Sequence, residues 1–240
     1  MRQIIKPVAV VFFISILFTG MVSGSDMNSS IKFHPIKHAT MVIQSKIVTV
    51  YVDPVGDPEL FSQYPKPDLI LITDIHRDHL NKEVVDAVKH PDTLIIATKD
   101  AVTQLKEGRA LNNGESFIYN GINIEAIPAY NLTTDRLKFH PRGRGNGYVI
   151  AMFGKRIYIS GDTEDIPEMR MLKDIDYAFI CMNLPYTMTE DQAASAVLEF
   201  KPKVVIPYHY RGKNGFSDID KFKNMVEKDG DIQVELLTWY

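Results

Sequence analysis

An apolar run that ends in four potential metal ligands constrains this chain more than any other feature. Residues 69–72 read Leu-Ile-Leu-Ile, which is typical of a strand buried on both faces. The next residues supply Asp74, His76, Asp78 and His79, and the first three alternate, so an extended segment would project them from one side. Imidazole and carboxylate groups are ligands for Zn²⁺, Fe²⁺ and Mn²⁺. The pattern predicts a metal site at a strand end, against the alternative of a solvated polar loop.

Two later segments repeat this arrangement. Residues 156–160 form a predicted strand that leads into Gly161 and Asp162, and the apolar residues 204–207 lead into His209. Chemistry is commonly placed on loops at the ends of rigid elements. Either segment alone would be weak evidence, but three strand ends that carry His or Asp indicate one shared site.

The remaining chain alternates β-branched runs with short helical segments, which predicts one domain over residues 31–240. Asn120-Gly121 is a strong hairpin signal because a type I′ turn needs positive φ at both central residues. Helices are predicted at 81–89, 189–200 and 217–228. Strands are predicted at 39–44, 47–53, 68–73, 93–97, 116–119, 122–128, 147–153, 155–160, 176–181, 203–207 and 233–238.

Taken in order, these motifs resemble the metallo-β-lactamase-fold hydrolases. The resemblance is to the stand-alone bacterial metal-dependent hydrolases that include the relatives of ascorbate-phosphate lactonase. It implies an αββα sandwich, a four-layer fold of two mixed β-sheets with the metal at one edge. The matching segments are His38-Ala39-Thr40, Tyr51-Val52-Asp53-Pro54, Asp74-x-His76-x-Asp78-His79 (the HxHxDH motif with Asp for the first His), Gly161-Asp162-Thr163 and His209.

The resemblance implies two metal positions. Asp78, His79 and His209 would form one, with Asp162 as a bridge to the other. The other would use Asp74, His76 and a third His, but Tyr130-Asn131 stands where the family usually has that His. Asn131 could take its place, or His140 could reach in as a substitute. One or two divalent ions are expected, with Zn²⁺ favoured over Mn²⁺ or Fe²⁺.

The implied chemistry is hydrolysis of a phosphoester, lactone or amide by a metal-bound hydroxide. Asp78 would orient the nucleophile, His38 would point towards the site, and Arg77 could bind an anionic substrate. Asp53 is either a partner that fixes a ligand imidazole or an ordinary turn residue before Pro54. The alternatives are a non-catalytic metal- or ligand-binding module and a di-iron oxidoreductase.

Two segments could select a small-molecule substrate. Residues 136–147 are basic and rich in glycine, and their arginines could bind a phosphate or carboxylate. The alternative is a solvated loop, as charge runs usually are. Residues 183–186 precede a predicted helix and could form one wall of the pocket.

The N-terminus has the order of a secretory signal peptide. Arg2 and Lys6 precede an uncharged apolar run over residues 7–22, and small residues follow at 23 and 24. We therefore expect residues 1–24 to be cleaved, leaving an exported periplasmic or secreted protein without a stable membrane anchor. An uncleaved anchor is the alternative. Cys181 is the single cysteine, which excludes an intrachain disulfide. Net charge is −3 without a Lys/Arg tract, so a nucleic-acid partner is not expected.

Overall fold

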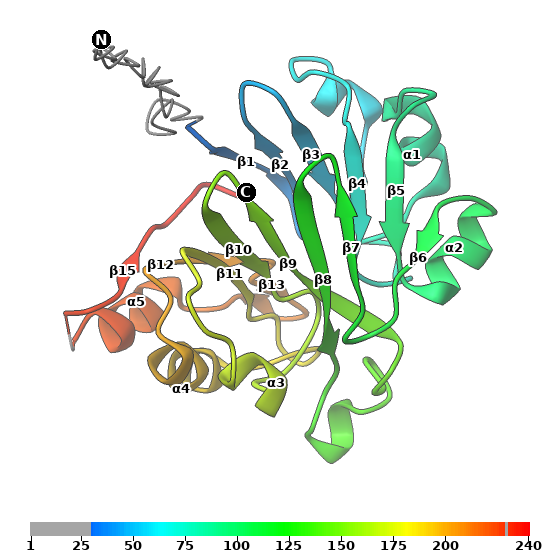
Figure 1. Cartoon of the computed structure of the whole chain (residues 1–240). Helices are drawn as coiled ribbons and strands as arrows, with labels where there is room; N and C mark the ends of the chain where they lie inside the picture. Colours follow the sequence, from blue (N-terminus) through cyan, green and yellow to red (C-terminus); the bar gives the residue numbers. More distant parts are fainter. Residues whose placement is uncertain (1–29, 229) are drawn as a thin grey trace, which may run out of the picture.

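Two β-sheets face each other in the computed structural model, which describes residues 30–228 and 230–240 (Figure 1). The first sheet has the order β1-β2-β3-β4-β5-β6 and the second β15-β12-β11-β10-β9-β8-β7. Helices lie outside both sheets (Figure 1), so the predicted αββα sandwich is confirmed. The proposed signal peptide, residues 1–24, lies outside the described residues. Among the described residues, no helix has the length and apolar character needed to cross a bilayer.

The first sheet combines a hairpin-rich edge with parallel strands. β1, β2 and β3 pair antiparallel, and β3, β4, β5 and β6 pair parallel. Helices α1 and α2 follow β4 and β5 along the chain and cover the outer face. The bounds are β1 Lys32–Lys37, β2 Thr40–Gln44, β3 Thr49–Val52, β4 Leu69–Ile72, β5 Leu94–Ala97, β6 Arg109–Ala110, α1 Lys82–Val88, α2 Lys99–Leu105 and a 3₁₀ turn at Pro58–Phe61.

The second sheet is antiparallel on one side and parallel on the other. β7, β8, β9 and β10 form antiparallel pairs, whereas β10, β11, β12 and β15 run parallel. The bounds are β7 Ser116–Tyr119, β8 Ile122–Ala129, β9 Gly145–Met152, β10 Lys155–Ile159, β11 Tyr177–Cys181, β12 Val204–Tyr208, β15 Gln233–Val234, the small pair β13 Arg211–Gly212 and β14 Gly215–Phe216, helices α3 Pro167–Arg170, α4 Glu190–Phe200 and α5 Ile219–Glu227, and a 3₁₀ turn at Thr134–Arg136.

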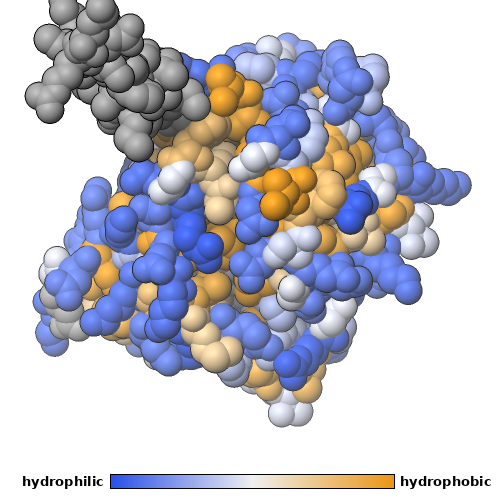
Figure 2. Space-filling model, viewed as in Figure 1, coloured by the Kyte–Doolittle hydropathy of each residue, from blue (hydrophilic) through white to orange (hydrophobic). Residues whose placement is uncertain are grey.

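Strand β4 shows why its sequence is apolar without interruption. Leu69 and Leu71 belong to the core between the sheets, whereas Ile70 and Ile72 pack with the residues of α1 and α2. Because successive side chains of a strand point to opposite faces, both faces must be apolar when both are covered. Figure 2 shows the complementary exterior, a face covered largely by hydrophilic residues with hydrophobic ones gathered around its middle.

Helix starts follow the capping residues of the sequence. Asn81 caps α1 by accepting from the N–H of Val84, and Thr189 forms a capping box with Gln192 at the start of α4. The helix expected from residue 217 instead begins at Ile219, because Asp218 accepts from the N–H of Lys221 and acts as the N-cap. Helices α2 and α3 and strands β1, β6, β13 and β14 lie outside the predicted elements.

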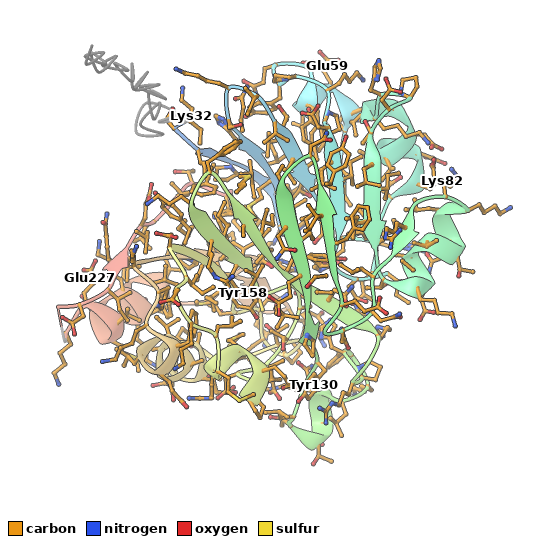
Figure 3. The ribbon with its side chains drawn as sticks, in the orientation of Figure 1. Lys32, Glu59, Lys82, Tyr130, Tyr158 and Glu227 are labelled. Carbon is orange, nitrogen blue, oxygen red and sulfur yellow. The ribbon has the colours of Figure 1, made fainter. Side chains whose placement is uncertain are left out.

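The parallel strands bring the predicted ligands to one edge. Asp53 follows β3, Asp74 follows β4, Asp162 follows β10 and His209 follows β12. Carboxyl ends of parallel strands meet at the same edge of a sheet, which is the usual place for a ligand site in mixed α/β folds. Tyr130, labelled in Figure 3, lies where the chain leaves β8 for the loop that reaches this edge.

Candidate metal centre

The structure gathers six of the predicted ligands into two groups. Asp74, His76 and His140 form the first group, and Asp78, His79 and His209 form the second. Within each group, one ligand atom from each residue lies within 4.8 Å of the others. A divalent ion bound by nitrogen and oxygen donors requires this kind of convergence.

Asp162 lies between the two groups and contacts both. Its Oδ2 is 3.0 Å from His140 Nε2 and 3.3 Å from His79 Nε2, and its Oδ1 is 3.4 Å from His209 Nε2. The preceding Gly161 has φ +63°, and a Cβ there would lie 2.6 Å from the carbonyl oxygen of Asn146. A glycine is therefore required for the chain to present Asp162 at this point.

Unpartnered polar atoms show that these residues fit a metal ion. Among the described residues, His79 Nε2, His140 Nε2 and Asp162 Oδ1 are buried without a hydrogen-bond partner. Buried polar groups are nearly always hydrogen-bonded, and each exception needs an explanation. Their short separations without hydrogen-bond geometry match ligands that surround a shared cation, so the donor set fits one or two divalent ions.

The shifted pKa values of Asp162 and His79 also favour a bound cation at this centre. Burial alone would raise the pKa of Asp162, but the imidazoles of His209, His79 and His140 outweigh it and hold this pKa well below its usual range. Burial would lower the pKa of His79, but Asp162 and Asp53 raise it well above its usual value. The buried carboxylates therefore stabilise a positive charge at this place.

Asp53 holds the ring of His79 from behind. Its Oδ2 is 2.8 Å from His79 Nδ1 and accepts the hydroxyl of Thr73 at 2.5 Å, while its Oδ1 accepts the N–H of Thr73 at 2.7 Å. With Nδ1 bonded to a carboxylate, Nε2 faces Asp162 and is the nitrogen that would bind a metal ion. Of the two interpretations of Asp53, the geometry favours the partner that orients a ligand.

His140, and not Asn131, reaches the first group. His140 Nδ1 lies 3.0 Å from the carbonyl oxygen of Tyr186, which leaves Nε2 for the site. Asn131 lies behind this ring, where its Nδ2 donates to the carbonyl oxygens of Arg136 at 2.9 Å and Tyr186 at 2.7 Å. The backbone N–H of Asn131 also donates to the carbonyl oxygen of His140 at 2.9 Å. Asn131 thus helps to hold the loop that carries His140, the histidine that completes the first group.

The basic loop supplies this histidine and uses its arginines internally. Arg136 pairs with the buried Glu164 at 2.6 Å, and Arg142 pairs with Glu168 at 2.9 Å. Arg142 also lies over the ring of Tyr130. These contacts hold the loop against helix α3 and the segment that joins β10 to it, so they favour a supporting role for these arginines over anion binding.

The third arginine of the loop is bound to a predicted ligand. Arg144 donates from Nε to Asp74 Oδ1 at 3.1 Å and from Nη2 to Asp74 Oδ2 at 2.9 Å. Nη2 also donates to the carbonyl oxygen of Phe139 and lies 3.3 Å from His76 Nε2. Sequence analysis missed this pair, which joins residues 70 positions apart.

His38 and Arg77 differ in their relation to the centre. The His38 ring lies 5.8 Å from the ring of His209, and its Nδ1 is 3.3 Å from the Tyr240 hydroxyl. Burial and the neighbouring His209 lower the pKa of His38 to about 4. His38 thus adjoins the second group without belonging to it. Arg77 is exposed and is not among the residues that line the cavity at the site.

A cavity of about 330 Å³ opens onto both groups. Asn183 and Tyr186 form part of its wall, as predicted for residues 183–186, and Phe139 lies beside Tyr186 with ring centroids 5.2 Å apart. Its lining residues are His76, Asp78, Phe139, His140, Asp162, Asn183 and Tyr186.

Comparisons with known proteins agree with this geometry. A family model described as the beta-lactamase superfamily domain matches residues 32–209. A UPF0173 metal-dependent hydrolase from Thermococcus onnurineus is 31% identical over 69% of this chain and 77% of its own length. The crystal structure of a protein from Parabacteroides distasonis, named as a metal-dependent hydrolase, shares 44% identity with a TM-score of 0.80, covering 86% of this chain and 92% of that one.

A more distant structure shares the fold alone. CmlA, a diiron β-hydroxylase from Streptomyces venezuelae, is 16% identical with a TM-score of 0.70, over 88% of this chain and 53% of its own. At this level of identity, the likeness carries no argument for oxidation chemistry.

Proposed function

Since this chain belongs to the beta-lactamase superfamily and is a metal-dependent hydrolase, we propose that it hydrolyses a neutral acyl substrate, that is, a carboxylic ester, lactone or amide. The observation that carries the proposal is the composition of the cavity. It places both ligand groups beside an amide donor and two aromatic rings. The three arginines of the adjacent loop are paired with acids, which favours a neutral substrate over an anionic one.

Asn183 is the donor that would orient the substrate carbonyl. Thr187 Oγ1 accepts the backbone N–H of Asn183 at 3.0 Å and donates to Asn183 Oδ1, which fixes the amide oxygen as the acceptor. Asn183 Nδ2 therefore points towards His209 Nε2, 3.2 Å away, at the cavity wall. Once His209 binds a metal, the N–H groups of Nδ2 are left for an oxygen of the substrate.

Asp78 is the group that would handle the proton of the attacking water. Its side chain is 42% exposed at the cavity, and its Oδ2 lies 3.4 Å from His209 Nε2. No hydrogen bond from the described residues reaches Oδ1, which is left to accept the water proton and orient the water. A bound divalent ion supplies the remaining chemistry by lowering the pKa of water towards about 7 and polarising the substrate oxygen.

Phe139 and Tyr186 would select the substrate by shape. Their edge-to-face pair forms an aromatic wall at the cavity. Aromatic and apolar surfaces contribute to binding through buried area. We therefore expect an aromatic or apolar group next to the scissile carbonyl.

A paired substrate panel tests the proposal. The Zn²⁺-loaded protein is assayed with p-nitrophenyl acetate and p-nitrophenyl phenylacetate, and with p-nitrophenyl phosphate and bis(p-nitrophenyl) phosphate. We expect turnover of the carboxylic esters, faster with phenylacetate, and its loss after chelation. Asn183→Ala should lower kcat by about 100-fold while elemental analysis shows an unchanged metal content. Faster turnover of a phosphoester would overturn the acyl assignment, and metal binding without any turnover would support the non-catalytic alternative.

We propose Zn²⁺ as the metal because imidazole donors predominate, with Mn²⁺ or Fe²⁺ as the alternatives because each group also contains a carboxylate. Elemental analysis of protein purified without chelator tests this assignment. We also propose that the protein is exported, on the strength of residues 1–24 alone. Cell fractionation, with mass determination of the mature chain, would show cleavage near residue 24 if export occurs by this route.

A further inference from the structure

The residues behind the two ligand groups carry opposite charges. Arg144 donates two hydrogen bonds to Asp74, whose side chain is 2% exposed, and also contacts His76. Behind the second group, the fully buried Asp53 holds His79. No lysine or arginine of the described residues forms an ion pair with Asp53 or Asp78.

Arg144 is fixed in place and does not merely approach Asp74. Its side chain is 17% exposed, and Nη2 also donates to the carbonyl oxygen of Phe139. The guanidinium is always charged and presents its donors in a rigid fork that matches a carboxylate. Asp74 Oδ2 thus contacts Arg144 Nη2 at 2.9 Å and His76 Nδ1 at 3.0 Å. An ion at the first group would share this oxygen with a permanent positive charge.

We propose that Arg144 is a built-in positive charge that weakens the first metal position. The chain then binds one divalent ion tightly at Asp78, His79 and His209. A second ion binds on the order of 100-fold more weakly at Asp74, His76 and His140, because like charges a few ångströms apart repel strongly at the partly buried edge of a protein. The inference rests on the proposed metal centre and not on the identity of the substrate.

Titration of the whole chain with Zn²⁺ alone tests the inference. Chelator-stripped protein is titrated in competition with a chromophoric chelator of known affinity, and elemental analysis after equilibrium dialysis gives the stoichiometry. We expect two phases with constants on the order of 100-fold apart. His209→Ala should remove the tight phase and His140→Ala the weak one. Two ions of equal affinity in the unaltered protein would overturn the proposal.

Substitution of Arg144 separates its charge from its geometry. Arg144→Gln should strengthen the weak phase by at least about tenfold and leave the tight phase unchanged. Arg144→Lys, which keeps the charge, should leave the two phases apart. Arg142→Gln is the matched control, because it removes a positive charge from the same loop at a side chain that pairs with Glu168 outside both groups.

The opposite result would give Arg144 a different role. If Arg144→Gln weakens the second ion, the guanidinium positions Asp74 for the metal and the proposal fails. Far-UV circular dichroism and thermal unfolding confirm that each variant is folded, and Arg144→Met, which keeps most of the side-chain stem, replaces Arg144→Gln if that variant is not. No metal binding at all would overturn this inference together with the metal centre. Unequal binding without hydrolysis would overturn only the proposed acyl hydrolysis.

Discussion

The two ligand groups share Asp162 and have similar donors, but their surroundings differ. Both groups take two residues from the loop that follows β4. The second group is completed by His209 after β12, and Asp53 at the end of β3 adds a negative charge behind it. The first group is completed by His140 from the long loop between β8 and β9, and Arg144 of that loop adds a positive charge. Equal numbers of ligands therefore do not imply equal affinity for a metal ion, because the residues that contact the ligands set the charge that an incoming ion meets.

The largest effect is expected where the two groups meet. Asp162→Ala removes the carboxylate that contacts His79, His140 and His209, so both ions should be lost. We expect ester turnover to fall by at least about 1000-fold and elemental analysis to find no tightly bound metal. The exposed Asp135 gives the control Asp135→Ala. Retention of one ion in Asp162→Ala would show that one group is complete without the bridge.

Metal removal should distinguish the groups through stability. An ion that binds only the folded chain stabilises it by about 2.7 kcal/mol at a free concentration 100 times its dissociation constant. The free Zn²⁺ concentration is set to about 100 times the dissociation constant of the tight position. Thermal unfolding should then show the stabilisation of the folded state by the ion in the unaltered chain and in His140→Ala. His209→Ala should not show it. Equal losses in both variants would contradict the assignment of the tight ion to the second group.

Substitution of Asp53 should weaken only the tight ion. Asp53→Asn replaces the carboxylate that faces His79 Nδ1. The affinity for Zn²⁺ at the tight position should therefore fall by about 10- to 100-fold. The weak constant should stay the same because Asp53 does not contact the first group. Competition titration measures both constants. A shift in the weak constant of the same size would mean that the two positions are not independent.

The smallest effect is expected at Asn131. Asn131→Ala removes the amide behind His140, but His140 Nδ1 keeps its contact with the carbonyl oxygen of Tyr186. We expect the affinity for Zn²⁺ at the weak position to fall by less than about tenfold, with no change in the affinity at the tight position. Loss of the weak ion altogether would indicate that Asn131, and not Tyr186, orients the histidine.

Sequence reasoning found the parts of this centre that follow buried strands. The apolar run 69–72 before Asp74, and the similar runs before Asp162 and His209, are local patterns, and the resemblance supplied the sandwich that joins them. It left Asn131 and His140 as alternatives because both lie on one loop, and loop conformation depends on tertiary contacts. The pair of Asp74 with Arg144 left no local signal, since only the folded chain brings these residues together.

The hydrogen bond between the N–H of Asn131 and the carbonyl oxygen of His140 has a consequence for how relatives are classified. Two positions nine residues apart in the chain are neighbours across one hydrogen bond, so the imidazole comes from the opposite side of the same loop. A comparison that checks each ligand only at its aligned position would record a missing histidine. It would then classify such a chain as an inactive pseudoenzyme. Surveys of inactive members of this superfamily should therefore compare the positions of metal-ligand atoms in the structure before they infer a loss of catalysis.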